Sequence, residues 1–382
     1  MRYPHVKMNM MSIWNRLFGK TIRTSLHAGI ENLEPRQLLS ASPQVKTIIA
    51  DNRGQATITF TAPLNPATVT SGTARIVTAG GDSLLNTADD VVATSTLQYS
   101  GDTLFITANL PAGTRYRVQL LSGGIFGTNG KALYGNTGHA AKGGNFDIST
   151  TSQSFFAHFL TIAGQINVAL TANTPLTNAN FNAYTNLGAW DNSFIQNNPL
   201  TSNGTHAHFI LVGGTFVVNS AGNIELATSK TKIKNEPVNH NTLGTLGMYK
   251  LTAAQDSDPN NSATNTWFFN LNDNRKTLDS QNGGYAVFGQ ITDKQGRNTL
   301  NALDKFPVFN ATNFITTSNA TSAALNDTKH QLTNAQTQLP VINPTTITAA
   351  NTISPANDLV TIYRVAMLMN LKATVKAGVQ QV

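Results

Sequence analysis

The feature that most constrains the fold is a series of short alternating segments that begins near residue 44. Between residues 44 and 121, six such segments are separated by clusters of Gly, Asn, Asp or Pro. Apolar and polar residues alternate most clearly in ATITF (56–60) and YRVQL (116–120). Every second side chain of such a segment faces the same side of a sheet. Regularly spaced short strands are typical of β-sandwiches, so we predict a mainly β chain with a sandwich over residues 44–150.

The composition agrees with a β-rich chain. Charged residues make up only 12% of the 382 residues, about half of the ~25% that is usual in soluble domains. The polar surface must therefore be built from Thr, Ser, Asn and Gln. Thr favours strands, whereas Ser and Asn compete with helical backbone hydrogen bonds. A chain of this length can form two or three domains, each with its own core.

Charge and hydropathy argue against nucleic-acid binding and against a membrane span. Six basic and two acidic residues lie in residues 1–41, whereas the other 341 residues hold 20 basic and 17 acidic residues. A nucleic-acid footprint would need a basic stripe on the folded part. No segment reaches the 18 or so apolar residues of a membrane helix. The best C-terminal segment, 359–371, is interrupted by Arg364, and we expect a buried strand or helix there.

Metal and cofactor chemistry also finds little support in the sequence. Cysteine is absent, which excludes disulfides and thiolate metal sites. His206 and His208 share one strand face, but no carboxylate or third histidine has usable spacing nearby, and we expect no metal. The glycine pairs do not open a helix with a Lys-Ser/Thr signature, so they are not phosphate loops. We expect no cofactor.

The N-terminal segment, residues 1–43, contains ENLEPRQLLSA (31–41). This stretch resembles the LEPR-x-LL leader of large exported bacterial proteins. The fixed positions of that motif are filled by Leu33, Glu34, Pro35, Arg36, Leu38 and Leu39. The resemblance implies routing to the cell envelope or outside, with the leader excluded from the folded protein. The alternative is a disordered tail with a chance match.

The predicted sandwich contains FTAPLNPATV (60–69), LPAGTRYRVQL (110–120) and GIFGTNGKALYG (124–135). These segments resemble the bacterial Ig-like domains of exported proteins, which implies a spacer or adhesion role. Asp82, Asp89 and Asp90 supply oxygen atoms that could bind calcium. The alternating ligands and terminal Glu of an EF-hand-like loop are missing, so we expect a solvated turn.

From about residue 154 the organisation changes to strands around two short helices. Residues 155–170 predict a hairpin that turns at Ala163-Gly164. A helix is expected to begin with Thr174 as its cap and Pro175 at its first position. Its buried face would hold Phe181, Tyr184 and Leu187. A strand is expected over 244–251, and a second helix over 297–306 would bury Leu300, Leu303 and Phe306.

Four further blocks follow in the same region: NEPVNHNTLGTLGM (235–248), DPNNSAT (258–264), FFNLNDN (268–274) and GYAVFGQI (284–291). In this order they resemble cyclophilins, a family of peptidyl-prolyl cis-trans isomerases. The resemblance implies an eight-stranded closed β-barrel with two short helices over residues 154–366. LVTIYRV (359–365) would supply the final strand after an Asn/Thr-rich insertion at about 310–357, whose segment 322–339 is expected to form a short helix. Residues 367–382 would form a C-terminal tail.

The resemblance also implies a site that grips proline. Rotation of an X-Pro amide crosses a barrier of about 18–20 kcal/mol. Catalysis needs an apolar pocket for the proline ring and a donor aimed at the prolyl nitrogen. The pocket positions of the family fall on Phe209, Ile210, Phe268, Leu278 and Tyr285, and Phe268 is counted with the catalytic positions.

The polar half of the family's site is altered in this sequence. The arginine that donates to the prolyl nitrogen is replaced by Gln196, and the two peptide-binding glutamines by Val212 and Thr266. Lys250 remains as a positive donor beside the site. We therefore expect weak isomerase activity on proline-containing peptides or protein segments. The alternative is a non-catalytic peptide-binding or structural module of an exported envelope protein.

Overall fold

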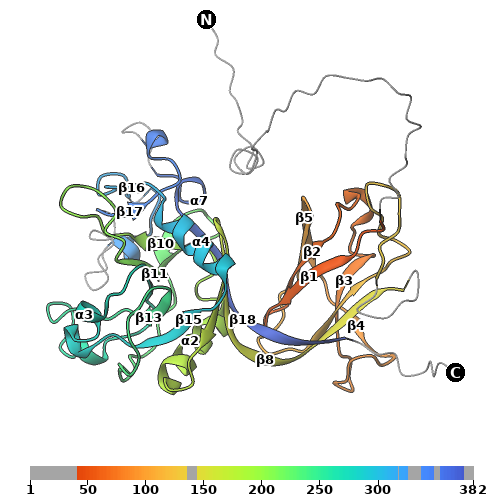
Figure 1. Ribbon diagram of the computed structural model, residues 1–382, viewed down its shortest axis with the longest axis horizontal. Helices are drawn as coiled ribbons and strands as arrows, with labels where there is room; N and C mark the ends of the chain where they lie inside the picture. The colour runs from red at the N-terminus through yellow and green to blue at the C-terminus, as the bar shows by residue number, and fades with distance from the viewer. Residues whose placement is uncertain (1–40, 136–143, 317, 326–336, 348–352, 374–382) are drawn as a thin grey trace, which may run out of the picture. The chain divides into compact units, whose positions relative to one another are not determined.

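The computed structural model describes residues 41–135, 144–316, 318–325, 337–347 and 353–373. They form a β-sandwich and a closed β-barrel, which share two long strands (Figure 1). The predicted leader motif lies outside the described residues. The first sheet of the sandwich has the order β1-β2-β6-β5. Its strands are β1 (Val45–Ala50), β2 (Gln55–Phe60), β6 (Thr103–Thr107) and β5 (Thr96–Ser100).

The second sheet of the sandwich continues the order β4-β3-β7-β8. Its strands are β4 (Val91–Val92), β3 (Ala74–Thr78), β7 (Tyr116–Leu120) and the first part of β8 (Phe146–Thr161). One apolar core contains Ile58 and Ile106 from the first sheet and Ile76 and Val118 from the second. Two sheets that share a core confirm the mainly β prediction for this region. The finer assignment to an Ig-like domain stays a prediction.

The barrel closes with the strand order β18-β10-β11-β14-β13-β15-β9-β8, because β18 also pairs with β8. Its other strands are β9 (Gly164–Leu170), β10 (Ser193–Asn197), β11 (Ile210–Val218), β13 (Thr245–Met248), β14 (Trp267–Asn270), β15 (Val287–Ile291) and β18 (Thr361–Ala373). A short strand, β12 (Ile224–Leu226), pairs with β11 outside this path. The expected eight-stranded barrel, its hairpin turn near Ala163 and its C-terminal closing strand are confirmed.

Side chains that point into the barrel form its core. This core includes Phe159, Trp267 and Phe269, whose rings meet edge to face with centroids 5.2–5.6 Å apart. Helix α4 (Lys294–Asp304) adds Leu300 and Leu303, as its apolar face predicts. Because buried and outward residues alternate along each strand, the same strands carry a second set of side chains outside the barrel.

Helix α2 (Pro175–Leu187) begins at the predicted proline and buries Phe181 and Tyr184. Two details of the prediction are wrong. Leu187 is 59% exposed, because it lies six residues beyond Phe181 and therefore about 120° around the helix from it, whereas Tyr184 and Thr185 of the same last turn are buried. The Thr174 side chain makes no capping bond; instead the Glu236 carboxylate accepts the N–H groups of the first turn at 3.2 and 2.8 Å. A carboxylate at a helix N-terminus also complements the helix dipole.

The Asn/Thr-rich insertion forms a separate apolar cluster against the barrel. Its elements are β16 (Val308–Phe309), α5 (Ser322–Leu325), β17 (Leu339–Pro340), η4 (Pro344–Thr346) and α7 (Pro355–Asp358). Ile315, Leu339 and Ile353 of the insertion pack on Phe194 and Phe216 of the barrel strands. The helix expected over 322–339 begins as α5, and residues 326–336 lie outside the described part of the chain.

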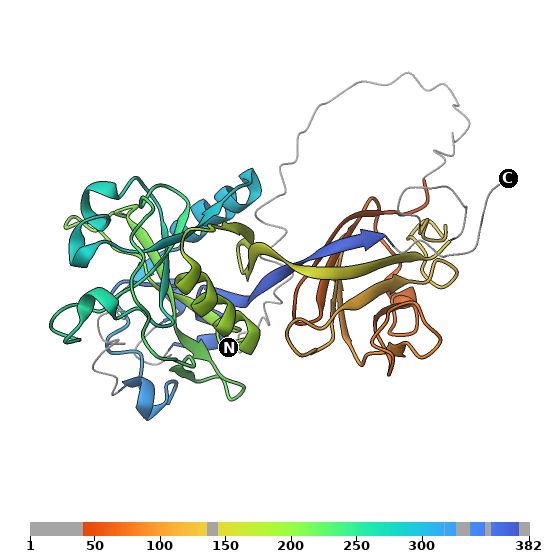
Figure 2. The same ribbon diagram turned by 90° about the horizontal axis from the view of Figure 1, so that it is seen from below.

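Strands β8 and β18 run side by side from the barrel into the sandwich (Figure 2). β18 continues to Ala373 and pairs with β8 as far as Ile148. The first residues of the predicted C-terminal tail, 367–373, therefore belong to a strand. Residues 367–373 pair with β8 because β7 and β9 use only one edge of that strand, and the backbone groups of its other edge need partners as well.

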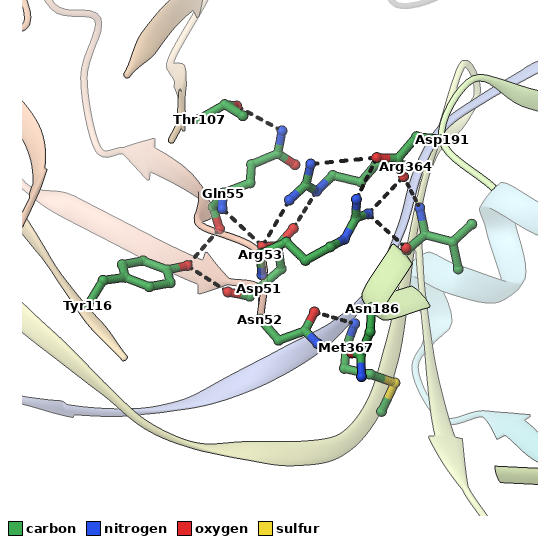
Figure 3. Close-up of polar contacts among 11 residues, drawn as sticks. Asp51, Asn52, Arg53, Gln55, Thr107, Tyr116, Asn186, Asp191, Arg364 and Met367 are labelled. Atoms are coloured by element: carbon green, nitrogen blue, oxygen red, sulfur yellow. Dashed lines mark hydrogen bonds and ion pairs between the residues drawn. The ribbon is translucent and has the colours of Figure 1, made fainter. Parts of the chain in front are cut away.

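A buried polar network lies where the two shared strands pass the turn between β1 and β2 (Figure 3). Arg364 of β18 donates to the Asp51 carboxylate, and their side chains are 8% and 3% exposed. Arg53 binds both carboxylate oxygens of Asp191 at 2.7 Å. Asn52 exchanges hydrogen bonds with the Met367 backbone. Ion pairs and hydrogen bonds of amide groups, rather than apolar packing, thus hold the turn in place.

Candidate functional site

An apolar cluster lies on the outside of the barrel, over strands β11, β13 and β14. We call it the outer cluster. Its members are Ile210, Val212, Phe268, Leu278 and Tyr285, with Phe209 and Tyr249 packed against them. Six of these seven residues are predicted site positions, and the structure brings all six together. Only Tyr249 is new.

Strand alternation explains why these residues share the outer face. Leu211 and Phe269 point into the barrel core, whereas their neighbours Val212 and Phe268 point outward and stand opposite each other in the β11–β14 pair. A Cβ atom at Gly247 of β13 would lie only 2.5 Å from the Phe268 ring. Glycine is therefore required there for the ring to lie flat against the sheet.

Three aromatic rings form the centre of the outer cluster. Phe268 and Tyr285 meet edge to face with centroids 5.8 Å apart. The Tyr249 ring packs against both, with its centroid 6.5 Å from that of Phe268 and 6.1 Å from that of Tyr285. Burial raises the pKa of the Tyr249 hydroxyl above its usual value, and burial together with the neighbouring Tyr249 raises that of Tyr285. Both rings are therefore neutral phenols below pH 10.

The side-chain amides of three asparagines bind the backbone next to the outer cluster, and the sequence predicted no role for them. Asn274 donates to the Phe209 carbonyl at 2.7 Å, and Asn241 donates to the Tyr285 carbonyl at 3.2 Å. Asn270 joins them, since it donates to Asn241 and accepts from Asn274. The signal was present in the spacing of FFNLNDN, because Asn270 and Asn274 are four residues apart. The partners, however, come from other parts of the chain.

Gln196, at the predicted donor position, lies on β10 beside β11 and is 5% exposed. Its Nε2 donates to Thr215 Oγ1 at 2.8 Å, and its Oε1 accepts the Thr215 N–H at 3.1 Å. Thr215 Oγ1 in turn lies 2.7 Å from Thr266 Oγ1. A glutamine amide has two N–H donors, so one N–H of Gln196 has no acceptor among the described residues. Thr266 lies two residues before Phe268 and so shares its face of β14.

Lys250 is 1% exposed and does not extend freely from the protein. Its ammonium donates to the carbonyls of Asn282 and Gly284 at 2.5 and 2.6 Å and lies 5.0 Å from the centre of the Tyr285 ring. Burial lowers the pKa of Lys250 to about 8, against a weaker opposing effect of Asp258. Two of its three donors are already used, so Lys250 mainly holds the 282–284 loop that precedes Tyr285.

The two histidines of the THAHF segment have an acidic partner that the sequence did not reveal. The Asp304 carboxylate of helix α4 pairs with the Nδ1 atoms of His208, at 2.5 Å, and His206, at 3.8 Å. The carboxylate is 96 residues beyond His208 in the chain, so spacing could not find it. Within the described ranges, no three His, Cys, Asp or Glu side chains are grouped as metal ligands.

The acidic turn of the sandwich is held by internal bonds. Asp89 accepts from the Asp82 N–H at 3.2 Å and from the Thr87 hydroxyl at 2.7 Å. Asp90 pairs with Arg117 of β7 at 2.9 Å. The Asp90 side chain is only 7% exposed in this pair, so internal hydrogen bonds and an ion pair hold the turn.

Comparison with known families decides the assignment of the barrel. Residues 156–323 match the family described as "Cyclophilin type peptidyl-prolyl cis-trans isomerase/CLD". This part of the chain is a cyclophilin-type domain. The cyclophilin-type match ends before β18, the strand that closes the barrel. No curated protein matches the chain, and no helix in the described ranges is long and apolar enough to cross a membrane.

Solved structures of cyclophilins are among the similar proteins. A Cryptosporidium parvum cyclophilin-type isomerase, crystallised in the presence of the dipeptide Ala-Pro, is 23% identical, with 40% of this chain and 87% of that chain covered and a TM-score of 0.30. A second structure of that isomerase is 18% identical, with coverages of 56% and 96% and a TM-score of 0.33. A Hirschia baltica cyclophilin is 12% identical, with coverages of 40% and 68% and a TM-score of 0.26.

Proposed function

We propose that the cyclophilin-type domain binds proline-containing peptide segments at the outer cluster and catalyses their cis–trans isomerisation slowly. The observation that carries this proposal is the convergence of Phe209, Ile210, Phe268, Leu278 and Tyr285 on one outer face of the barrel. These apolar side chains fit the ring of a proline, which carries no charge and no N–H donor.

The polar half of the proposed site determines how fast the reaction proceeds. As the amide twists, its nitrogen regains lone-pair character, and a donor aimed at it stabilises the twisted state more than the planar one. The spare N–H of Gln196 is the donor that we assign to this role. A neutral donor forms a bond about half as strong as a charged one.

The expected rate follows from this weaker donor. Loss of one preorganised donor typically lowers a rate by about 10²–10³. Gln196 replaces the donor only in part, since its amide is also bonded on two sides to Thr215. We therefore expect acceleration above the uncatalysed reaction, whose time constant is about tens to hundreds of seconds, but well below that of a site with arginine.

We further propose that the protein is exported and that the sandwich is an Ig-like spacer for the barrel. The LEPR-x-LL motif of residues 33–39 supports export. In this setting the clients would be proline-containing segments of envelope proteins. Protease accessibility of the protein on intact cells tests the location, and protection in unlysed cells would contradict it.

The function is tested by exchange NMR on a blocked tetrapeptide with one X-Pro bond. The whole chain from residue 42 onward must be used, because a fragment that starts at residue 154 would cut β8 in two. We expect cis–trans exchange faster than in buffer. Phe268→Ala should abolish it, Gln196→Arg should raise it at least ~10-fold, and Leu187→Ala, at an exposed helix position, should leave it unchanged.

Three outcomes distinguish an isomerase from a peptide-binding module and from a domain with neither function. Exchange that Phe268→Ala removes supports the isomerase. Peptide-induced shifts at the outer cluster without exchange would make the barrel a binding module. If neither shifts nor exchange occur with the natural chain or with Gln196→Arg, the proposed function is wrong.

A further inference from the structure

The residues that would contact a proline ring are nearly inaccessible. Phe268 is 1% exposed, Leu278 4%, Tyr285 6% and Ile210 7%. A ligand that binds through these side chains must first reach them. The side chains of the outer cluster that retain partial exposure are Phe209 and Tyr249. These two side chains are therefore the candidates for a cover over the rest.

The ring contacts single out Tyr249. It packs against both Phe268 and Tyr285, at 6.5 and 6.1 Å between centroids. Among the described residues, Phe209 makes no comparable ring contact with either. Tyr249 is thus the partly exposed side chain that packs against both central rings.

The backbone of Tyr249 is fixed, whereas its ring is held only by apolar contacts. The Tyr249 N–H donates to the Thr266 carbonyl at 2.9 Å, and the next residue, Lys250, is anchored by two carbonyls. The Tyr249 hydroxyl makes no hydrogen bond to the described part of the protein. A rotation about the side-chain bonds can therefore move the ring without breaking a hydrogen bond within that part of the protein.

We propose that Tyr249 controls access to the outer cluster, and that a proline-containing peptide binds only after the Tyr249 ring has swung away from Phe268 and Tyr285. This inference rests on the proposed function, because it concerns the same site. It makes Tyr249 the residue that sets the apparent affinity of the site.

The size of the effect follows from the two ring contacts. Each aromatic pair shifts a population by roughly 2- to 13-fold. Two pairs combine to a factor of about 5 to 160. Because Tyr249 is partly exposed, we take the lower part of this range, about 10-fold, which leaves the uncovered state populated at about 10% of molecules. A ligand that binds only this state has an apparent Kd raised by the inverse of that fraction, or ~10-fold. Removal of the ring should recover this factor.

The first experiment compares Tyr249→Ala and Tyr249→Phe in the chain from residue 42 onward. The probe is a blocked X-Pro tetrapeptide, and its Kd is measured by ¹H–¹⁵N shift titration. We expect Tyr249→Ala to bind ~10-fold more tightly and Tyr249→Phe to bind like the natural chain, because the ring and not the hydroxyl covers the cluster. Weaker or equal binding by Tyr249→Ala, with binding by the natural chain intact, would overturn the access role and leave the proposed function standing.

A second readout does not depend on the peptide. A soluble paramagnetic agent broadens the ring signals of Phe268 in proportion to their exposure. We expect severalfold greater broadening in Tyr249→Ala than in Tyr249→Phe, and Tyr249→Val serves as a smaller change if the alanine variant does not fold. If Phe268 becomes exposed but no variant binds the peptide, the proposed function fails while the covering role stands. If Phe268 stays protected, the inference is wrong.

Discussion

Replacement of Arg364 by methionine tests how the turn between β1 and β2 is held against β18. In the natural chain the Arg364 guanidinium compensates the Asp51 carboxylate, and their side chains are 8% and 3% exposed. Methionine keeps an unbranched side chain but removes the charge. Asp51 would then be left with the N–H groups of Arg53 and Gln55, each at 2.9 Å, as its other donors.

The expected loss is large because a buried charge is left without its partner. Removal of one member of a buried ion pair typically costs about 3–5 kcal/mol. Folded domains are stable by only about 5–15 kcal/mol in total. With a urea dependence of about 3 kcal/mol per molar, the midpoint of unfolding should fall by about 1 M or more.

The assay follows urea unfolding by circular dichroism and by the fluorescence of Trp190 and Trp267, both of which are buried in the barrel core. The matched control is Arg275→Met, which breaks an exposed arginine–aspartate pair with side chains 55% and 49% exposed. We expect no measurable midpoint shift in the control, because water screens exposed pairs. The double variant Arg364→Met/Asp51→Asn should lose less than the sum of its two single changes.

Two results would refute this reasoning. If Arg364→Met and Arg275→Met shift the midpoint equally, burial of the pair does not determine its contribution. If the double variant loses the full sum of the single changes, Asp51 and Arg364 do not stabilise each other.

Three further predictions concern individual side chains. Burial lowers the pKa of Lys250 from 10.5 to about 8. Between these pH values the unfolded state binds more protons than the folded state, so Lys250 makes the free energy of unfolding rise with pH. Lys250→Met should remove that rise in urea midpoints measured from pH 7.5 to 10. Glu236→Gln should destabilise by about 1 kcal/mol in urea unfolding, because a neutral amide is a poorer acceptor for the N–H groups that begin α2; an unchanged midpoint would contradict this role. Gly247→Ala places a methyl group 2.5 Å from the Phe268 ring and should cost about 1–3 kcal/mol while shifting the ring signals of Phe268 in NMR spectra; a spectrum like that of the natural chain would show that the ring has room.

Much of the fold could be predicted from local pattern. The alternation in residues 56–60 and 116–120 follows from strand geometry alone, and Pro175 begins its helix as its fixed φ angle requires. The composition of the site could also be predicted, because the apolar positions lie on motifs of the cyclophilin family. Leu187 shows the limit: steps of three residues drift around a helix, so the second step from Phe181 reaches the exposed side.

The contacts that determine how the site works depend on residues far apart in the chain. Gln196 is bonded on two sides to Thr215, which leaves it one N–H for a ligand. Glu236, and not Thr174, caps α2, and Asp304 reaches His208 across 96 residues. The sequence by itself therefore determined which residues face one side of each strand or helix, because that depends on backbone periodicity between near neighbours. Only the tertiary structure decided which side chains meet, such as Tyr249 beside Phe268 or Arg364 beside Asp51, 313 residues away, because such pairs form only when strand pairing and the shared strands bring separate segments of the chain together.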